Sequence, residues 1–251
     1  MVTRRKTTRR ATGKRAAARP PVTVARAVEA ARVIADAEGL EALSMRRLAA
    51  ALGVEAMSLY HHLPNKEALL DAMVDGVFDE IERPPEALEW RAAMRVRMTS
   101  MRAVLLRHRW ALRVLESRTS PGSSTLAHHD AVLGCLRRGG LSLPLAAHAY
   151  AVLDAFVFGF VHTELTLPFE TPGEAQAVVG EMFAAMPAGA FPHLAELTVG
   201  HVLRPGYAFA SSFPFGLELL LDALEARRRA AQNPAGTDGS PERAIASSDS
   251  S

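Results

Sequence analysis

The chain contains little cysteine and few aromatic residues. Cys135 is the only cysteine among 251 residues, and aromatic residues make up 6% of the sequence against 49% for all hydrophobic residues. A lone cysteine cannot form a disulfide within one chain, which favours a protein of the reducing cytoplasm. With so few aromatic rings, alanine and leucine must fill most of the core.

The motifs of common enzyme classes are also missing. The sequence has no Gly-x-Ser-x-Gly elbow, no glycine-rich phosphate loop and no His-Glu-x-x-His zinc motif. It has no polar–apolar alternation long enough to predict a β-strand. These absences favour an all-α protein that is not an enzyme, with no catalytic residue, no metal site and no cofactor.

One apolar run approaches the length of a membrane span. Residues 143–161 are interrupted by His148 and Asp154, and an acid inside a span is costly. The first residues lack the apolar segment of a signal peptide. We therefore expect a buried bundle helix and no membrane contact.

Acidic residues are absent from the first nineteen positions, which carry eight basic ones. The net charge of the whole chain is +2, which leaves −6 for residues 20–251. Composition predicts a disordered basic arm over residues 1–21. Such an arm would bind DNA phosphates or reach a minor groove, although it could also serve only as a solubilising tail.

Residues 43–66, LSMRRLAAALGVEAMSLYHHLPNK, form two short helical patterns around a glycine. Ser44 is a good N-cap, and Gly53 can adopt the left-handed conformation that ends a helix. The second pattern starts at Glu55 and has Leu59 as its inward anchor. Two such helices predict a helix-turn-helix, whose second helix, expected over residues 55–62, enters the DNA major groove.

Further helices flank this segment. Thr23 can cap a helix over residues 24–38 that ends at Gly39, and Asn65 can cap another that runs to about Glu82. The Pro84-Pro85 pair then marks a boundary. The predicted organisation is a basic arm (1–21), a helix-turn-helix domain (22–83), a larger helical domain (84–230) and a disordered tail (231–251).

Residues 24–81 resemble the DNA-binding domain of the tetracycline-repressor (TetR) family. The resemblance lies in AARVIADAEGLEALSMRRLAAALGV followed by SLYHHLPNKEALLDAM. It implies a transcriptional regulator, most simply a repressor of a palindromic operator in double-stranded DNA. Matched position by position, it implies the following DNA contacts: Arg46 to a base or the backbone; Ser58, His61 and His62 to bases; Tyr60 and Lys66 to phosphates; and Arg47 and Met57 as neighbouring candidates.

The second half predicts further helices near residues 87–107, 110–117, 124–138, 143–165, 172–185 and 214–230, with a break at 187–192. Helices 143–165 and 214–230 are apolar on most sides, so they must be buried on most sides. A second copy of the chain is the simplest partner, and the resemblance implies a homodimer that pairs these helices in a four-helix bundle. Burial inside one subunit is the alternative.

The resemblance also implies a small, largely apolar effector bound within residues 90–165. The candidate pocket residues are His148, Asp154, Phe158 and His162, although the histidines could equally be ordinary structural residues. The tetracycline repressor uses a histidine to bind its drug with magnesium, and the comparable residues 113–120, RVLESRTS, have none. We therefore do not expect a tetracycline–magnesium site. His128 and His129 are adjacent, so their rings diverge, and both are expected at the surface.

Two other functions stay open at this point. One is a ligand-independent or activating regulator whose second domain only dimerises. The other is a helical small-molecule-binding protein or enzyme whose DNA-binding part is vestigial.

Overall fold

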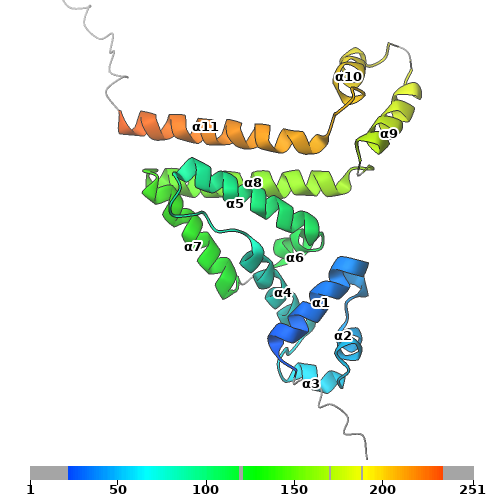
Figure 1. The fold of residues 1–251 in the computed structure, drawn as a ribbon, viewed down its shortest axis with the longest axis vertical. Coiled ribbons are helices and arrows are strands. Elements are labelled where there is room, and N and C mark those ends of the chain that lie inside the picture. The colour runs from blue at the N-terminus through cyan, green and yellow to red at the C-terminus, as the bar shows by residue number, and fades with distance from the viewer. Residues whose placement is uncertain (1–21, 119–120, 170, 188, 234–251) are drawn as a thin grey trace, which may run out of the picture.

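A computed structural model describes residues 22–118, 121–169, 171–187 and 189–233, and over this part of the chain it contains helices and no strand (Figure 1). The basic arm and residues 234–251 of the tail lie outside the described residues. The helices are α1 (Val24–Glu38), α2 (Met45–Leu52), α3 (Ala56–Tyr60), α4 (Lys66–Glu80), α5 (Trp90–Arg107), α6 (Ala111–Ser117), α7 (Ser123–Arg138), α8 (Leu143–Thr166), α9 (Pro172–Ala184), α10 (Pro192–Leu197) and α11 (Ser212–Gln232). The shorter turns are η1 (Leu40–Ala42), η2 (Thr198–Val202) and η3 (Phe209–Ser211).

The first three helices form a small head whose ends are set by local hydrogen bonds. Ser44 Oγ accepts from Arg47 N at 3.2 Å, which caps α2. Asn65 Oδ1 accepts from Ala68 N at 2.7 Å, which caps α4. Gly53 ends α2 in the left-handed region, with φ 68° and ψ 38°. The predicted caps and the glycine turn are confirmed.

Small buried residues let the helices of the head pack closely. Ala27 and Ala31 of α1 and Ala49 of α2 lie in the core beside Leu48 and Leu59. A larger side chain at such a site would push the two helices apart or force strain. The head therefore presents α3 at a fixed angle, anchored inward by Leu59.

Helix α4 joins this head to the remaining helices, called the body here (α5 to α11). It packs against α1 on the head side and against α5, α6 and α7 on the body side. Its buried residues are Leu69, Met73, Val74, Val77 and Phe78. Movement of α4 relative to the body would therefore move the head as well.

In the body, α8 packs against α5, α7 and α11. Figure 1 shows α8 and α11 side by side, with α9 and α10 near their ends that lie away from α7. By length and composition alone, α8 could cross a membrane. Core helices of soluble proteins pass the same test, and Leu153, Val157 and Val161 of α8 lie in the core.

The structure corrects several sequence-based boundaries. Helix α3 ends at Tyr60, so His61 and His62 lie in the turn that follows it. The predicted break at 187–192 is followed by an unpredicted helix, α10, which continues into a π-helical turn. Pro192 is the first residue of α10, where proline's missing N–H costs nothing, so here it begins a helix.

Candidate nucleic-acid interface and ligand cavity

The outer side of the head carries most of the predicted DNA contacts. Met57 and Tyr60 are exposed on α3, and His61 and His62 are exposed directly after it. Ser58 is half-buried. The short helix thus points its polar and flexible side chains outward, because Leu59 holds its opposite face in the core.

Three basic residues beside α3 differ in their surroundings. Arg46 is exposed on α2. Arg47 forms an ion pair with Glu38 of α1, so part of its charge is already compensated. Lys66 Nζ donates to the backbone oxygen of Leu43 at 2.8 Å, which ties the start of α4 to the segment before α2. An ammonium has three donors, so Lys66 keeps others for a phosphate.

A polar cluster fastens the head to the body. His108, buried between α5 and α6, donates from Nδ1 to Asp36 of α1 at 2.9 Å. Trp110 Nε1 donates to the same carboxylate at 2.6 Å. The other ring nitrogen of His108 lies 3.2 Å from Glu80 of α4, which also pairs with Arg32 of α1. One buried imidazole therefore contacts both the head and the connecting helix.

Asp75 of α4 caps α7 from outside that helix. Its carboxylate accepts from Thr125 N at 2.8 Å, from Thr125 Oγ1 at 2.9 Å and from Ser124 N at 3.2 Å. A side chain at Gly122 would collide with this carboxylate, since an added Cβ would lie 2.3 Å from Asp75 Cγ. Burial alone would raise the pKa of Asp75, but the hydrogen bonds from Thr125 and Ser124 outweigh it and hold the pKa below 3.8.

This cap predicts a pH-dependent contribution to stability. Because the folded pKa is depressed, the contribution is complete above the unfolded pKa and is lost as pH falls through the folded pKa. Asp75→Ala should lower the free energy of unfolding by about 1–2 kcal/mol at pH 7. The difference in unfolding free energy between the variant and the parent should become smaller towards pH 2. Urea unfolding at each pH measures this difference. Asp130→Ala is the control, because Asp130 is exposed on α7, and it should change the unfolding free energy little. A loss of stability in Asp75→Ala that is the same at every pH would contradict the role of Asp75 as a charged cap.

A cavity of about 310 Å³ lies between α4, α6, α7 and α8. Its lining includes Phe78 of α4, Leu112 and Leu115 of α6, and Tyr150, Asp154 and Phe158 of α8. This volume is at the lower end of the range for small-molecule sites. Since Phe78 belongs to the connecting helix, a molecule in this cavity would touch α4 directly.

The structure brings together only some of the predicted pocket residues. Asp154 and Phe158 line the cavity, whereas His148 and His162 are exposed on α8 and do not line it. The prediction that His128 lies at the surface is wrong, because His128 is fully buried and accepts from Arg97 Nε at 3.1 Å. Tyr150 was missed, although its spacing of four residues from Asp154, and of eight from Phe158, places all three on one side of α8.

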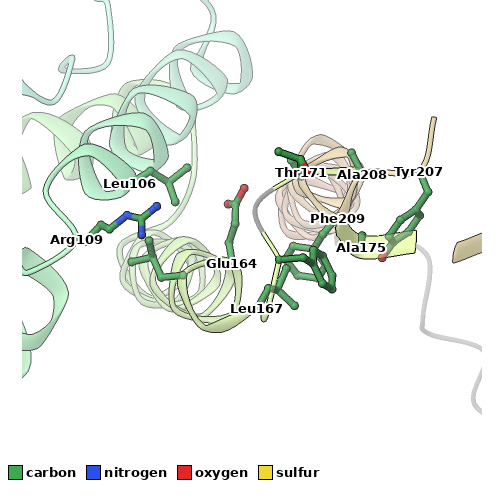
Figure 2. Close-up of a pocket in the computed structure, with 12 residues that line it drawn as sticks. Leu106, Arg109, Glu164, Leu167, Thr171, Ala175, Tyr207, Ala208 and Phe209 are labelled. Carbon is green, nitrogen blue, oxygen red and sulfur yellow. The ribbon is translucent and has the colours of Figure 1, made fainter. Parts of the chain in front are cut away.

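A second hollow, of about 340 Å³, lies at the far end of α8 (Figure 2). Leu106 and Arg109 approach it from the end of α5, Glu164 from α8, and Tyr207 and Phe209 from the segment before α11. Glu164 accepts from Arg102 Nε at 2.9 Å. No residue of α4 lines this hollow, so it lacks the direct contact with the connecting helix that the first cavity has.

A helix-turn-helix head joined through one helix to a helical body, with a cavity beside that helix, is the architecture of a DNA-binding regulator. Comparison with known families agrees with this class. Residues 27–73 match the family described as "Bacterial regulatory proteins, tetR family", and residues 84–228 match "Tetracyclin repressor-like, C-terminal domain". The chain belongs to the TetR family of transcriptional regulators.

Individual relatives cover most of the chain. The HTH-type transcriptional repressor DrrR1 of Streptomyces coeruleorubidus is 36% identical over 86% of this chain and 83% of its own. Apo ActR from Streptomyces coelicolor has a TM-score of 0.70 at 31% identity, covering 84% of this chain and 99% of its own. ActR in complex with actinorhodin has a TM-score of 0.71 at 33% identity, covering 83% and 99%. The predicted family, all-α fold and role in transcription regulation are confirmed.

Proposed function

We propose that this protein is a ligand-responsive transcriptional repressor that binds a palindromic operator as a homodimer. The observation that carries the proposal is the cavity beside α4, lined by Phe78 from the helix that holds the head. A similar chain is named a repressor, and a structure of similar fold holds actinorhodin. We expect such a protein to act in the cytoplasm, where its DNA target lies.

On DNA, each head would place α3 in the major groove. Arg46 has the reach and charge to bind guanine O6 and N7, while Ser58, His61 and His62 would contact bases from α3 and the turn after it. Tyr60 and Lys66 would hold phosphates and fix the register of the head, with Arg47 and Met57 at the edge of the contact. Two heads related by a two-fold axis would read half-sites about 34–36 Å apart.

Exposed apolar side chains on α8 and α11 support the homodimer. Leu143 and Val152 of α8 and Phe215 and Leu219 of α11 all face outward in the single chain. Large apolar side chains gathered on two adjacent helices are typical of an interface between copies. Pairing these faces would form a four-helix bundle and set the spacing of the two heads.

The cavity supports a ligand-driven switch over the ligand-independent alternative. A molecule between Phe78 and Phe158 would press α4 and α8 apart or draw them together, and Asp75 already couples α4 to α7. A ligand switches the protein only if it binds the two arrangements with different affinity. Couplings of this kind are typically about 1–3 kcal/mol.

Sequencing of the DNA retained by the purified protein will identify the operator, and two substitutions then test the contacts. Arg46→Ala should cost about 1–3 kcal/mol and relax specificity at one base position if Arg46 reads a base. Lys66→Ala should weaken binding evenly across sequences. It should also reduce the slope of log affinity against log salt concentration by about one, the value for one lost phosphate contact. Fluorescence anisotropy on operator variants at several salt concentrations measures both effects.

The control is Arg138→Ala, an exposed arginine at the end of α7, which should leave DNA binding unchanged. Thermal unfolding shows whether each variant keeps its fold, which matters for Lys66 because it also holds the Leu43 carbonyl. If both head variants protect the operator as well as the parent does, the contact assignments are wrong. If no palindromic sequence is retained at all, the proposed function is wrong.

A further inference from the structure

Three buried polar atoms without a hydrogen-bond partner belong to side chains that contact one another in a row behind one wall of the cavity. They are Arg97 Nη2, His128 Nδ1 and Asp154 Oδ1. Arg97 is 0% exposed and Asp154 8%. Arg97 Nη1 is 2.6 Å from Asp154 Oδ1, close enough for an ion pair but without an aligned hydrogen bond. Buried polar groups are almost always paired, so this cluster leaves part of its hydrogen-bonding capacity unused.

Of these three residues, only Asp154 lines the cavity. Its neighbour on the lining is Tyr150, one helical turn earlier on α8. Burial, and then the negative charge of Asp154, raise the pKa of Tyr150 to about 12, so the hydroxyl stays protonated at pH 7. Asp154 Oδ1 is buried against Arg97, so the part of Asp154 that lines the cavity is the acceptor offered to an occupant.

The charges around the cavity are already balanced. Arg97 offsets Asp154, and Arg118 donates from Nε to Asp71 at 3.0 Å. Burial lowers the pKa of His129, which is therefore neutral at pH 7. A charged occupant would leave water without finding a free counter-charge, which is costly. The matching occupant is uncharged and donates a hydrogen bond.

The walls favour a flat ring system. Phe78, Tyr150 and Phe158 line the cavity, and the ring of His129 lies edge-on to Tyr150 and to Phe78, at 5.3 and 5.6 Å between centroids. Aromatic walls pack best against another aromatic ring. We propose that the cavity binds an uncharged, flat aromatic molecule whose hydroxyl donates a hydrogen bond to Asp154. This inference rests on the proposed ligand-responsive function and names the chemical class of the ligand.

Four naphthalene probes separate the features of this proposal. They are 2-naphthol, 2-methoxynaphthalene, 2-naphthoate and 2-naphthylmethylammonium, titrated into the full-length protein by calorimetry. We expect 2-naphthol to bind about ten-fold or more tightly than the methoxy compound, because a hydrogen bond to a charged acceptor has about that effect. Both charged probes should bind more weakly than 2-naphthol.

Two variants locate the acceptor. Asp154→Asn should abolish the preference for 2-naphthol, since an amide can donate to the methoxy oxygen. Tyr150→Phe is the matched control, because it removes a hydroxyl of the same cavity but keeps the carboxylate, so the preference should persist. Loss of the preference in Tyr150→Phe would assign the selection to Tyr150 and overturn the proposal.

If Asp154→Asn does not fold, the four probes still test the proposal on the parent protein alone. Equal affinity for 2-naphthol and 2-methoxynaphthalene, tighter binding of either charged probe, or no binding of any probe would overturn the proposal. Operator binding is measured separately on the same samples. If the protein binds a palindromic operator but fails the probe test, the ligand proposal is wrong and the proposed function stands. If it passes the probe test but binds no operator, the proposed function is wrong and the ligand proposal stands.

Discussion

Replacement of Arg97 by methionine is expected to lower the free energy of unfolding by about 3–5 kcal/mol. Arg97 is completely buried, and it pairs with Asp154 and donates to His128. Methionine fills a similar volume but leaves the carboxylate of Asp154 buried without a counter-charge. Urea or thermal unfolding of the purified variant measures the loss.

The double variant Arg97→Met/Asp154→Leu tests the cause of that loss. Removing both charges takes away the unpaired carboxylate, so this variant should be close to the parent in stability or more stable. Arg102→Met is a useful comparison, because Arg102 and Glu164 form a similar pair that is partly exposed, and its loss should be smaller. A double variant as unstable as the single one would show that packing, rather than the stranded charge, sets the cost.

Replacement of Leu219 by arginine is expected to separate the proposed homodimer. Leu219 lies on α11 with 55% of its surface exposed, beside Phe215 one turn earlier. In a four-helix bundle it would be buried against the partner copy, where an arginine without a counter-charge is strongly unfavourable. A single head contacts one half-site, so operator affinity should fall about 100-fold or more.

Leu126→Arg is the matched control for this experiment. Leu126 is 54% exposed in the single chain, but it lies on α7, outside the proposed interface. Light scattering after size-exclusion chromatography gives the oligomeric state, and anisotropy gives the operator affinity. A Leu219→Arg protein that stays dimeric would show that the dimer interface does not include this face of α11. If both variants change the oligomeric state and the operator affinity equally, the cause would be added surface charge in general.

The head was predictable because its determinants are local. Ser44 and Asn65 each accept from an amide three residues ahead, and Gly53 needs only its own backbone freedom. Interactions of this range follow from the order of the residues, so cap and turn positions are readable before any fold is known. The end of α3 was harder to place, since His61 and His62 fit a helical pattern as well as the turn they occupy.

The cavity was only partly predictable. Asp154 was a candidate because an acid within an apolar helix is unusual, yet its partner Arg97 lies 57 residues earlier in the chain. The two adjacent histidines were predicted to lie at the surface. In the structure His128 instead accepts a hydrogen bond from the buried Arg97, and the ring of His129 packs against Tyr150. Pairings of this kind depend on how whole helices align, which periodicity alone does not encode.

The amino-acid sequence by itself determined the family, the helical composition, the head with its caps, and the apolar excess on α8 and α11. These features arise from residue type and short spacings, which act within one helix or one turn. Only the tertiary structure decided that Phe78 joins Tyr150, Asp154 and Phe158 around one cavity, and that His148 and His162 stay outside it. The reason is that side chains from four helices meet there, and their alignment is set by the packing of the entire core.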